Sequence, residues 1–391
     1  MYDLIVKSGI VVDPSQHLHG ISDVAIEDGK IAKIAADIPA EEAKRIVEVK
    51  GKVVTPGLID LHTHVYSGVN ANGVDPDIGG VRAGITTMVD AGSAGCDNFG
   101  GFPAHILPNA ATEIICFLHI CRTGLNTTPD IFSLESIDLD KTIEVIKDNN
   151  GVISGVKARM VSPALEIMGM EMPRLAKRAA MEAGVPLMVH IGDTMKRYNA
   201  NVIRELLPIL DKGDIVTHYF TANPGGVLDS NSKLVPEAKE AHDRGVWLDT
   251  AHGQMNFSFD VGQKILDQGV VPHCISTDLT VPGRRNTVHS MTEMMTRFLA
   301  MGFTFDQVVT MSTENPAKAA GVADRLGTLA VGKQADLSVL EIKDGDWVLY
   351  DILREGMKSD KAVIPVMAIK KGKVFEAGWG PRPWGWEPDS A

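Results

Sequence analysis

Cysteine is scarce in this sequence. The 391 residues include four cysteines, none of them in a Cys-x-x-Cys spacing: Cys96, Cys116, Cys121 and Cys274. This density is too low for a disulfide-rich secreted protein, so it favours a reducing compartment. Apolar residues make up 44% of the chain and charged residues 23%, which excludes a disordered or fibrous protein.

Long basic runs and long apolar runs are also missing. Lys and Arg number 38 against 50 Asp and Glu, and no basic run is longer than the two residues of Lys370-Lys371. Such a chain has little with which to neutralise a nucleic-acid backbone or an anionic membrane. No stretch approaches the ~18 apolar residues of a membrane span, and residues 1–7 carry no basic leader. We expect a cytoplasmic protein without a nucleic-acid or membrane partner.

The two ends of the chain share a β-rich texture. Residues 1–55 and 326–391 both consist of short alternating runs, with turns at Asp28-Gly29 and Lys371-Gly372. Because chain termini often lie close together, these ends can pair into one domain. The expected strands are Leu4–Val12, Val24–Glu27, Lys30–Ala35, Arg45–Val49, Ala335–Ile342, Val363–Lys370 and Lys373–Glu376.

The middle of the chain, residues 56–325, alternates short apolar runs with amphipathic helical stretches. This pattern predicts repeated βα units around a parallel sheet, and eight units match the ~250 residues of a (β/α)8 barrel. An open doubly wound sheet is the alternative, but it would place a Gly-rich loop where His62-Thr63-His64 stands. The eight runs are Gly57–His64, Thr86–Ala91, Glu113–Arg122, Gly151–Lys157, Leu187–His190, Ile215–His218, Val246–Thr250 and His273–Asp278.

Polar residues that bind metals occupy the ends of five of these runs. Catalytic groups of such barrels gather at the C-terminal ends of the strands, so we expect these side chains to meet there. Imidazole is a common metal ligand, and a carboxylate adds negative charge. Each residue alone has an ordinary structural explanation, but the regular spacing makes coincidence the weaker account. The set is His62, His64, Lys157, His190, His218 and Asp278.

Several motifs in this order resemble the amidohydrolase superfamily, specifically members whose binuclear metal centre is bridged by a carboxylated lysine. The resemblance implies a (β/α)8 TIM barrel with a small β-sandwich built from both chain termini. The motifs are Thr55-Pro56-Gly57-Leu58-Ile59-Asp60-Leu61-His62-Thr63-His64, Gly84-Ile85-Thr86-Thr87, Val156-Lys157, Val189-His190, Thr217-His218, Ser276-Thr277-Asp278, Asn315-Pro316-Ala317 and Gly332-Lys333-Gln334-Ala335-Asp336-Leu337.

The same resemblance implies a role for each of the six residues. His62, His64 and Asp278 would bind one metal, His190 and His218 the second, and N6-carboxylysine at Lys157 would bridge them. Two such ions can share a hydroxide that attacks the scissile carbonyl, with Asp278 as the catalytic proton shuttle. Zinc is the favoured metal, although manganese and iron use similar ligands.

The sequence supports other classes of reaction less well. Ser93, in Ala91-Gly92-Ser93-Ala94-Gly95, nearly matches a serine-hydrolase motif, but the first Gly is missing. Dihydroorotases usually follow the His-x-His pair with an Arg, whereas Val65 stands here. Mononuclear deaminases of the superfamily generally lack the bridging lysine, which Lys157 provides. The blocks 86–95 and 157–160 resemble the deacetylase branch, some members of which cleave acetyl-(R)-mandelate.

We therefore expect a hydrolase that cleaves an acetyl ester or amide of a small, carboxylate-bearing substrate. The residues that could bind the substrate are Arg159, His252, Arg122 and Arg284. A cyclic amide hydrolase of the dihydroorotase or hydantoinase kind and a non-catalytic scaffold are the alternatives. The Trp- and Pro-rich tail, Trp379–Glu387, is expected to pack on the barrel or on another subunit of a homo-oligomer.

Overall fold

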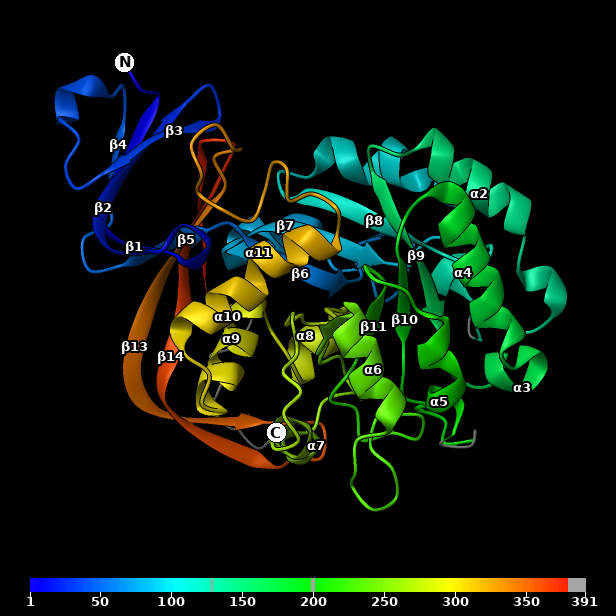
Figure 1. The fold of residues 1–391 in the computed structure, drawn as a ribbon. Coiled ribbons are helices and arrows are strands. Elements are labelled where there is room, and N and C mark those ends of the chain that lie inside the picture. The colour runs from blue at the N-terminus through cyan, green and yellow to red at the C-terminus, as the bar shows by residue number, and fades with distance from the viewer. Residues whose placement is uncertain (128, 198–200, 379–391) are drawn as a thin grey trace.

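A parallel sheet forms the centre of the molecule in the computed structural model, which describes residues 1–127, 129–197 and 201–378 (Figure 1). Within these residues the sheet holds seven strands, and each strand pairs with the next along the chain. The strands are almost wholly buried because helices and loops cover them. They are β6 (Leu58–Thr63), β7 (Ile85–Ala91), β8 (Glu113–His119), β9 (Ile153–Arg159), β10 (Leu187–His190), β11 (Ile215–Thr217) and β12 (Trp247–Asp249).

The eighth predicted run closes the barrel without forming a regular strand. Parallel bridges connect Cys274 to Asp249 of β12 and Leu279 to Thr63 of β6. Asp278 has a φ of +50°, which interrupts the extended backbone that a ladder requires. The predicted third run also ends early, since β8 stops at His119 rather than at residue 122.

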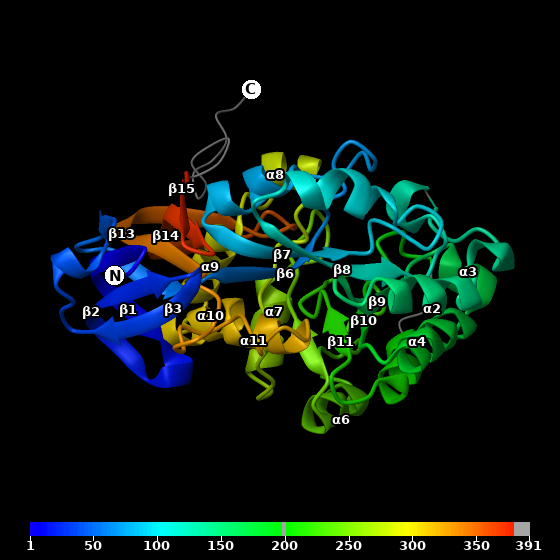
Figure 2. The ribbon, with the colours of Figure 1, turned by 90° about the horizontal axis from the view of Figure 1, so that it is seen from above.

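Helices follow most of the strands and cover the outside of the barrel (Figure 2). Asp138 caps α2 (Leu139–Asp148) by accepting a hydrogen bond from the Lys141 amide, and Gly184 ends α4 (Glu171–Ala183) in the left-handed conformation. In the described part of the chain, no helix combines the length and apolar composition that a membrane crossing needs. The helices are α1 (Pro76–Gly79), α2 (Leu139–Asp148), α3 (Ala164–Met168), α4 (Glu171–Ala183), α5 (Val202–Leu206), α6 (Pro236–Arg244), α7 (Phe259–Leu266), α8 (Val281–Asn286), α9 (Met291–Ala300), α10 (Phe305–Ser312) and α11 (Glu314–Ala319).

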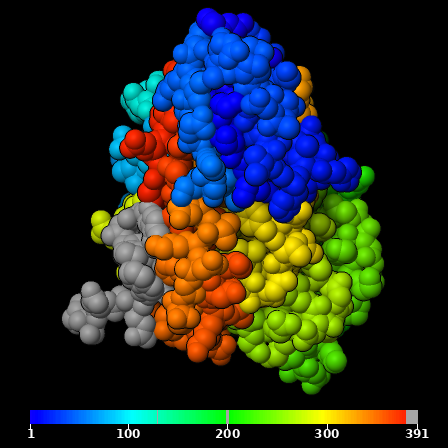
Figure 3. Space-filling view, turned by 90° about the vertical axis from the view of Figure 1, so that its left-hand side faces the viewer, coloured from blue at the N-terminus to red at the C-terminus, as the bar shows by residue number. Residues whose placement is uncertain are grey.

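The two chain ends form a second, mixed sheet with its own hydrophobic core. On the surface, the blue N-terminal part lies next to the orange and red C-terminal part (Figure 3). The predicted turns are present, since Asp28, Gly29, Lys371 and Gly372 all have positive φ. The order is β15-β14-β13-β5-β1-β2-β3, with β4 beside β1. The bounds are β1 (Leu4–Asp13), β2 (Leu18–Glu27), β3 (Lys30–Ala35), β4 (Ile46–Glu48), β5 (Val53–Pro56), β13 (Leu337–Tyr350), β14 (Gly356–Lys370) and β15 (Lys373–Glu376).

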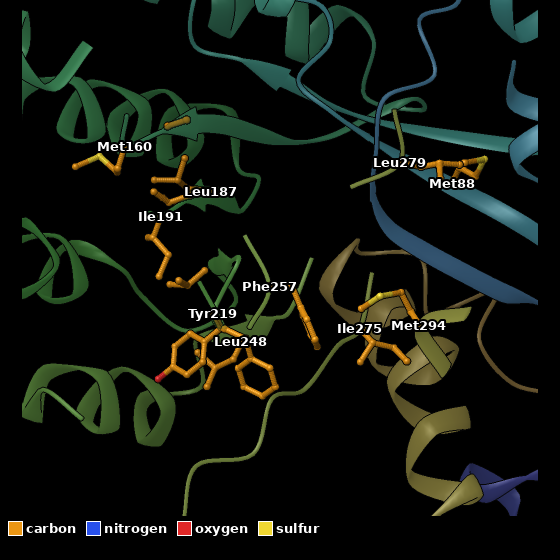
Figure 4. Packing of buried hydrophobic residues seen from close by; sticks show 14 of the residues in the cluster. Met88, Met160, Leu187, Ile191, Tyr219, Leu248, Phe257, Ile275, Leu279 and Met294 are labelled. Carbon is orange, nitrogen blue, oxygen red and sulfur yellow. The ribbon is translucent and has the colours of Figure 1, made fainter. Parts of the chain in front are cut away.

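Together, the barrel and the sheet from both ends confirm the predicted fold class. Strands β13 and β14 are longer than expected because they extend as a hairpin that packs on α9. The barrel core draws on strands and helices alike, as Leu187, Leu248 and Met294 illustrate in Figure 4. The domain boundaries at residues 55 and 325 stay a prediction, and the tail Trp379–Glu387 lies outside the described residues.

Candidate metal centre and active site

The six predicted ligands meet at the C-terminal end of the barrel. Lys157 Nζ lies 3.0 Å from His62 Nε2, and Asp278 Oδ1 lies 3.1 Å from His64 Nε2. Nε2 of His218 is 3.8 Å from the other oxygen of Asp278. The rings of His190 and His218 are 4.1 Å apart between centroids. Five different βα units therefore contribute to one cluster.

Two of these imidazoles hold a buried nitrogen that nothing in the described structure satisfies. Nε2 of His190 and Nε2 of His218 have no hydrogen-bond partner among the described residues. Leaving a buried polar atom unpaired costs about 1–3 kcal/mol, and a metal ion bound at these two nitrogens would remove this cost. In addition, atoms of His62, His218 and Asp278 lie within 4.8 Å of one another. This donor set fits divalent metal ions.

Burial keeps the imidazoles of His62, His190 and His218 in the neutral form that binds metals. It lowers the pKa of His62 and His190 well below the usual value, and that of His218 to about 4. Burial alone would raise the pKa of Asp278, but the hydrogen bond with His64 and the neighbouring His218 and Lys157 side chains hold it below its usual value. The site thus presents neutral nitrogens and an ionised carboxylate.

Lys157 is fully buried among these groups. Burial lowers the pKa of its amine to about 7, so a large share of the amine is neutral near physiological pH. A glycine makes room for it: a Cβ on Gly92 would lie 2.8 Å from Lys157 Cγ.

Two of the predicted ligands have unusual backbone conformations. His218 has a φ of +67° and Asp278 a φ of +50°, values that non-glycine residues rarely adopt. In a regular strand, Thr217 and His218 would point to opposite faces. The left-handed turn at His218 lets both side chains reach the centre of the barrel. Such strain is typical of functional sites.

A cavity of about 250 Å³ opens beside the six residues, and Arg159 lies in its wall. Arg159 Nη1 is 3.3 Å from Asp130 Oδ2, which in turn lies 3.4 Å from His119 Nε2. The lining residues are His62, His64, Asn72, Ala91, Leu125, Thr127, Pro129, Asp130, Lys157, Arg159, Val161, Ser162, His190, Thr194, Met195, Gln254, Met255, Asn256, Asp278 and Thr280.

The other three predicted substrate residues lie outside this lining. Arg122 is three residues beyond the end of β8, and its side chain pairs with Asp97 at 2.8 Å. Arg284 belongs to α8 and does not border the cavity. His252 is buried, with Nδ1 on the Gly253 carbonyl at 2.7 Å. Of the four, the structure brings Arg159 to the cavity.

Sequence reasoning missed the residues that hold the ligands in place. His64 Nδ1 contacts Ser93 Oγ at 2.9 Å, and His62 Nδ1 contacts Thr217 Oγ1 at 2.8 Å. Asp130 was missed because it lies in the loop after β8, far from any predicted strand end. The sequence position of Thr217 next to His218 could have indicated its role, since a hydroxyl adjacent to one metal ligand can hydrogen-bond to another ligand.

Comparisons with known proteins agree with this geometry. The sequence profile of the amidohydrolase family matches residues 53–375. A deacetylase of Agrobacterium fabrum is 34% identical over 322 residues, covering 82% of this chain and 78% of the relative. A deacetylase of Brucella anthropi is 32% identical over 93% of this chain and 90% of its own length.

Two solved structures have a similar fold, and their titles name other activities. An adenine deaminase is 28% identical with a TM-score of 0.87, covering 96% of this chain and 100% of its own. A dihydroorotase is 29% identical with a TM-score of 0.84, covering 96% and 99%. Proteins of this family generally use metal ions, often in binuclear centres. The profile match over most of the chain and the two deacetylases above 30% identity show that the chain belongs to the amidohydrolase family and is a hydrolase.

Proposed function

We propose that this hydrolase removes an acetyl group from a small carboxylate-bearing substrate, using two divalent metal ions, most simply zinc. The observation that carries the proposal is the meeting of six ligand groups around the Nε2 atoms of His190 and His218, which have no hydrogen-bond partner among the described residues. We infer that the acyl group is acetyl because the two relatives above 30% identity are named deacetylases. His62, His64 and Asp278 would hold one ion, and His190 and His218 the other.

Lys157 would bridge the ions as a carbamate. Its neutral amine adds to CO2, the nitrogen loses a proton, and the product is an anion with two oxygens. An unmodified lysine cation at this position would repel divalent ions, whereas the carbamate attracts both. Burial of Lys157 supports this step because it favours the neutral amine.

Asp278 would move the proton that hydrolysis requires. When bound, the metals supply Lewis acidity and lower the pKa of the attacking water. Asp278 is ionised and 15% of its side chain is exposed towards the cavity, so its carboxylate can accept a proton and pass it to the leaving oxygen or nitrogen.

Arg159 would bind the carboxylate of the substrate. It lies two residues beyond Lys157 on the same strand face, and its side chain lines the cavity. Asp130 accepts a hydrogen bond from Nη1, and no other hydrogen bond engages the guanidinium among the described residues, so its other donors can bind a second carboxylate. An acetylated α-hydroxy acid, such as acetyl-(R)-mandelate, or an N-acetyl amino acid offers such a group.

A cyclic amide hydrolase is the second candidate, because a dihydroorotase structure aligns with 96% of this chain. The residue after His64 weighs against it, since Val65 is buried and uncharged where a carboxylate-binding Arg is expected.

Hydrolysis of a substrate panel by the zinc-loaded protein tests the proposal. The panel contains N-acetyl-D- and N-acetyl-L-amino acids, acetyl-(R)- and acetyl-(S)-mandelate, dihydroorotate, hydantoin and adenine. We expect release of acetate from an acetylated acid. Ring opening without acetate release would replace the proposal with the cyclic amide reaction, and ammonia release from adenine with deamination. A protein that retains no zinc after loading and hydrolyses none of these compounds would favour a non-catalytic scaffold.

A further inference from the structure

A chain of three side chains connects the metal centre to a buried carboxylate behind it. His62 Nδ1 lies 2.8 Å from Thr217 Oγ1, and Thr217 Oγ1 donates to Asp249 Oδ2 at 2.6 Å. The three residues come from β6, β11 and β12, and all are buried. Strands β6 and β11 are not neighbours in the barrel sheet, so the contact crosses the barrel interior.

The chemistry of these groups decides which atom donates in each of the two hydrogen bonds. Burial raises the pKa of Asp249 to about 6, while hydrogen bonds from Thr217 and Ser276 oppose the increase. At pH 8 its carboxylate is therefore ionised and can only accept hydrogen bonds. The Thr217 proton must point to Asp249. Only a lone pair of Thr217 Oγ1 then faces His62, so His62 Nδ1 must carry the hydrogen.

This arrangement leaves the other ring nitrogen of His62 without a proton. Nε2 of His62 lies 3.0 Å from Lys157 Nζ and 3.5 Å from Asp278 Oδ1, so its lone pair faces the proposed metal position. His218 reaches the same tautomer differently, by donating from Nδ1 to the Ala251 carbonyl at 2.8 Å. A hydroxyl needs a carboxylate behind it to do the same, because a hydroxyl by itself can also donate.

We propose that Thr217 and Asp249 are positioning residues that hold His62 in its metal-binding tautomer. This inference rests on the proposed metal centre and adds to it the source of the orientation of one ligand. Without Asp249, the Thr217 hydroxyl is free to donate to His62 Nδ1. The ring proton then moves to Nε2 and blocks the lone pair that would bind the metal.

Four variants separate this role from a merely structural one. Thr217→Val keeps the shape of the side chain and removes the hydroxyl, whereas Thr217→Ser keeps the hydroxyl. Asp249→Ala removes the acceptor. Ser276→Ala is the matched control, because Ser276 Oγ donates to Asp249 at 2.8 Å without contacting His62.

Two measurements on the full chain decide the matter. Histidine 15N NMR of the metal-free wild type at pH 8, assigned with a His62→Gln variant, reports which ring nitrogen carries the proton. Chelator competition reports zinc affinity. We expect Nδ1–H at His62 in the wild type, and zinc affinity about 10–100-fold lower for Thr217→Val and Asp249→Ala. Thr217→Ser and Ser276→Ala should stay close to wild type.

A proton on Nε2 of wild-type His62 would overturn the inference, and this result needs no variant to fold. Wild-type zinc affinity in both Thr217→Val and Asp249→Ala would also overturn it. A wild type that binds no zinc would instead contradict the proposed metal centre. The two failures are therefore distinguishable.

Discussion

His64 Nδ1 lies 2.9 Å from Ser93 Oγ, and the Ser93 amide donates to Asp90 at 2.8 Å. The serine that nearly matches a nucleophile motif thus contacts a proposed metal ligand. Its hydroxyl is placed to orient His64 rather than to attack a carbonyl.

Replacing Ser93 by Ala should therefore weaken metal binding without abolishing the reaction. We expect Ser93→Ala to lose about tenfold in activity at limiting zinc and to recover in excess zinc. Asp278→Asn should lose about 10²–10⁴-fold in kcat at any zinc concentration, because it removes the proton carrier. Zinc titrations of both variants check this. A loss in Ser93→Ala that zinc cannot restore would favour a serine nucleophile.

Gly92 gives a second prediction. A Cβ at this position would lie 2.8 Å from Lys157 Cγ, and φ is +90°. Gly92→Ala should displace Lys157 and lower the metal content of the purified protein. Gly213→Ala is the matched control, because Gly213 has a φ of +96° and no atom within 4 Å of the added Cβ. Both variants should lose about 1–2 kcal/mol of unfolding free energy from the backbone. Equal metal contents would remove the steric explanation.

Arg159 and Arg122 make a matched pair for the substrate carboxylate. Each pairs with an aspartate, but only Arg159 of these two lines the cavity. We expect Arg159→Gln to raise KM for acetylated acids about 10–100-fold, the value of a charge-assisted hydrogen bond, and to change the neutral methyl ester far less. Arg122→Gln should match wild type on both substrates. An equal effect of Arg159→Gln on the acid and its ester would remove the proposed contact.

Glu113 connects the barrel to the sheet of the chain ends and should make stability depend on pH. Lys370 Nζ lies 2.6 Å from both Glu113 and Asp336, and Arg325 also pairs with Glu113. Burial opposes ionisation, but Lys370, Gln334 and Arg325 lower the pKa of Glu113 to about 2. The unfolded chain then binds more protons between pH ~4.5 and ~2. The stabilisation is complete above this window and is lost as pH falls through it.

We expect Glu113→Gln to lower the free energy of unfolding by about 3 kcal/mol at pH 7 and by less near pH 3. Urea unfolding at both pH values measures the difference. Glu182→Gln is the control, because Glu182 forms an exposed pair with Arg178 and should cost under about 0.5 kcal/mol. A difference that does not shrink at low pH would exclude an ionised Glu113 as its cause.

Most of the fold could be predicted because the periodicity of apolar residues in the sequence matches the face that each strand or helix buries. Strands β3, β10 and β15 begin and end at the predicted residues. The hairpin of β13 and β14 extends through residues 343–362, where charged residues and Gly345 hide the alternation. The eighth run was expected to be a strand, but the left-handed Asp278 prevents it from forming a ladder.

The candidate site was predictable where residues stand on strands. A strand alternates its side chains, so Lys157 and Arg159 could be placed on one face from their spacing alone. Arg122 and Arg284 lie in a loop and a short helix, where side-chain direction depends on contacts that no spacing records. The partners Thr217 and Asp249 required knowledge of which strands face each other across the barrel.

The metal content of the purified chain tests the central proposal most directly. Wild type and Lys157→Met, both produced in zinc-supplemented medium, should be measured by mass spectrometry of the metals. We expect close to two metal ions per wild-type chain and at most one in Lys157→Met, since the bridge is lost. Equal metal content in both proteins would contradict a centre bridged by Lys157.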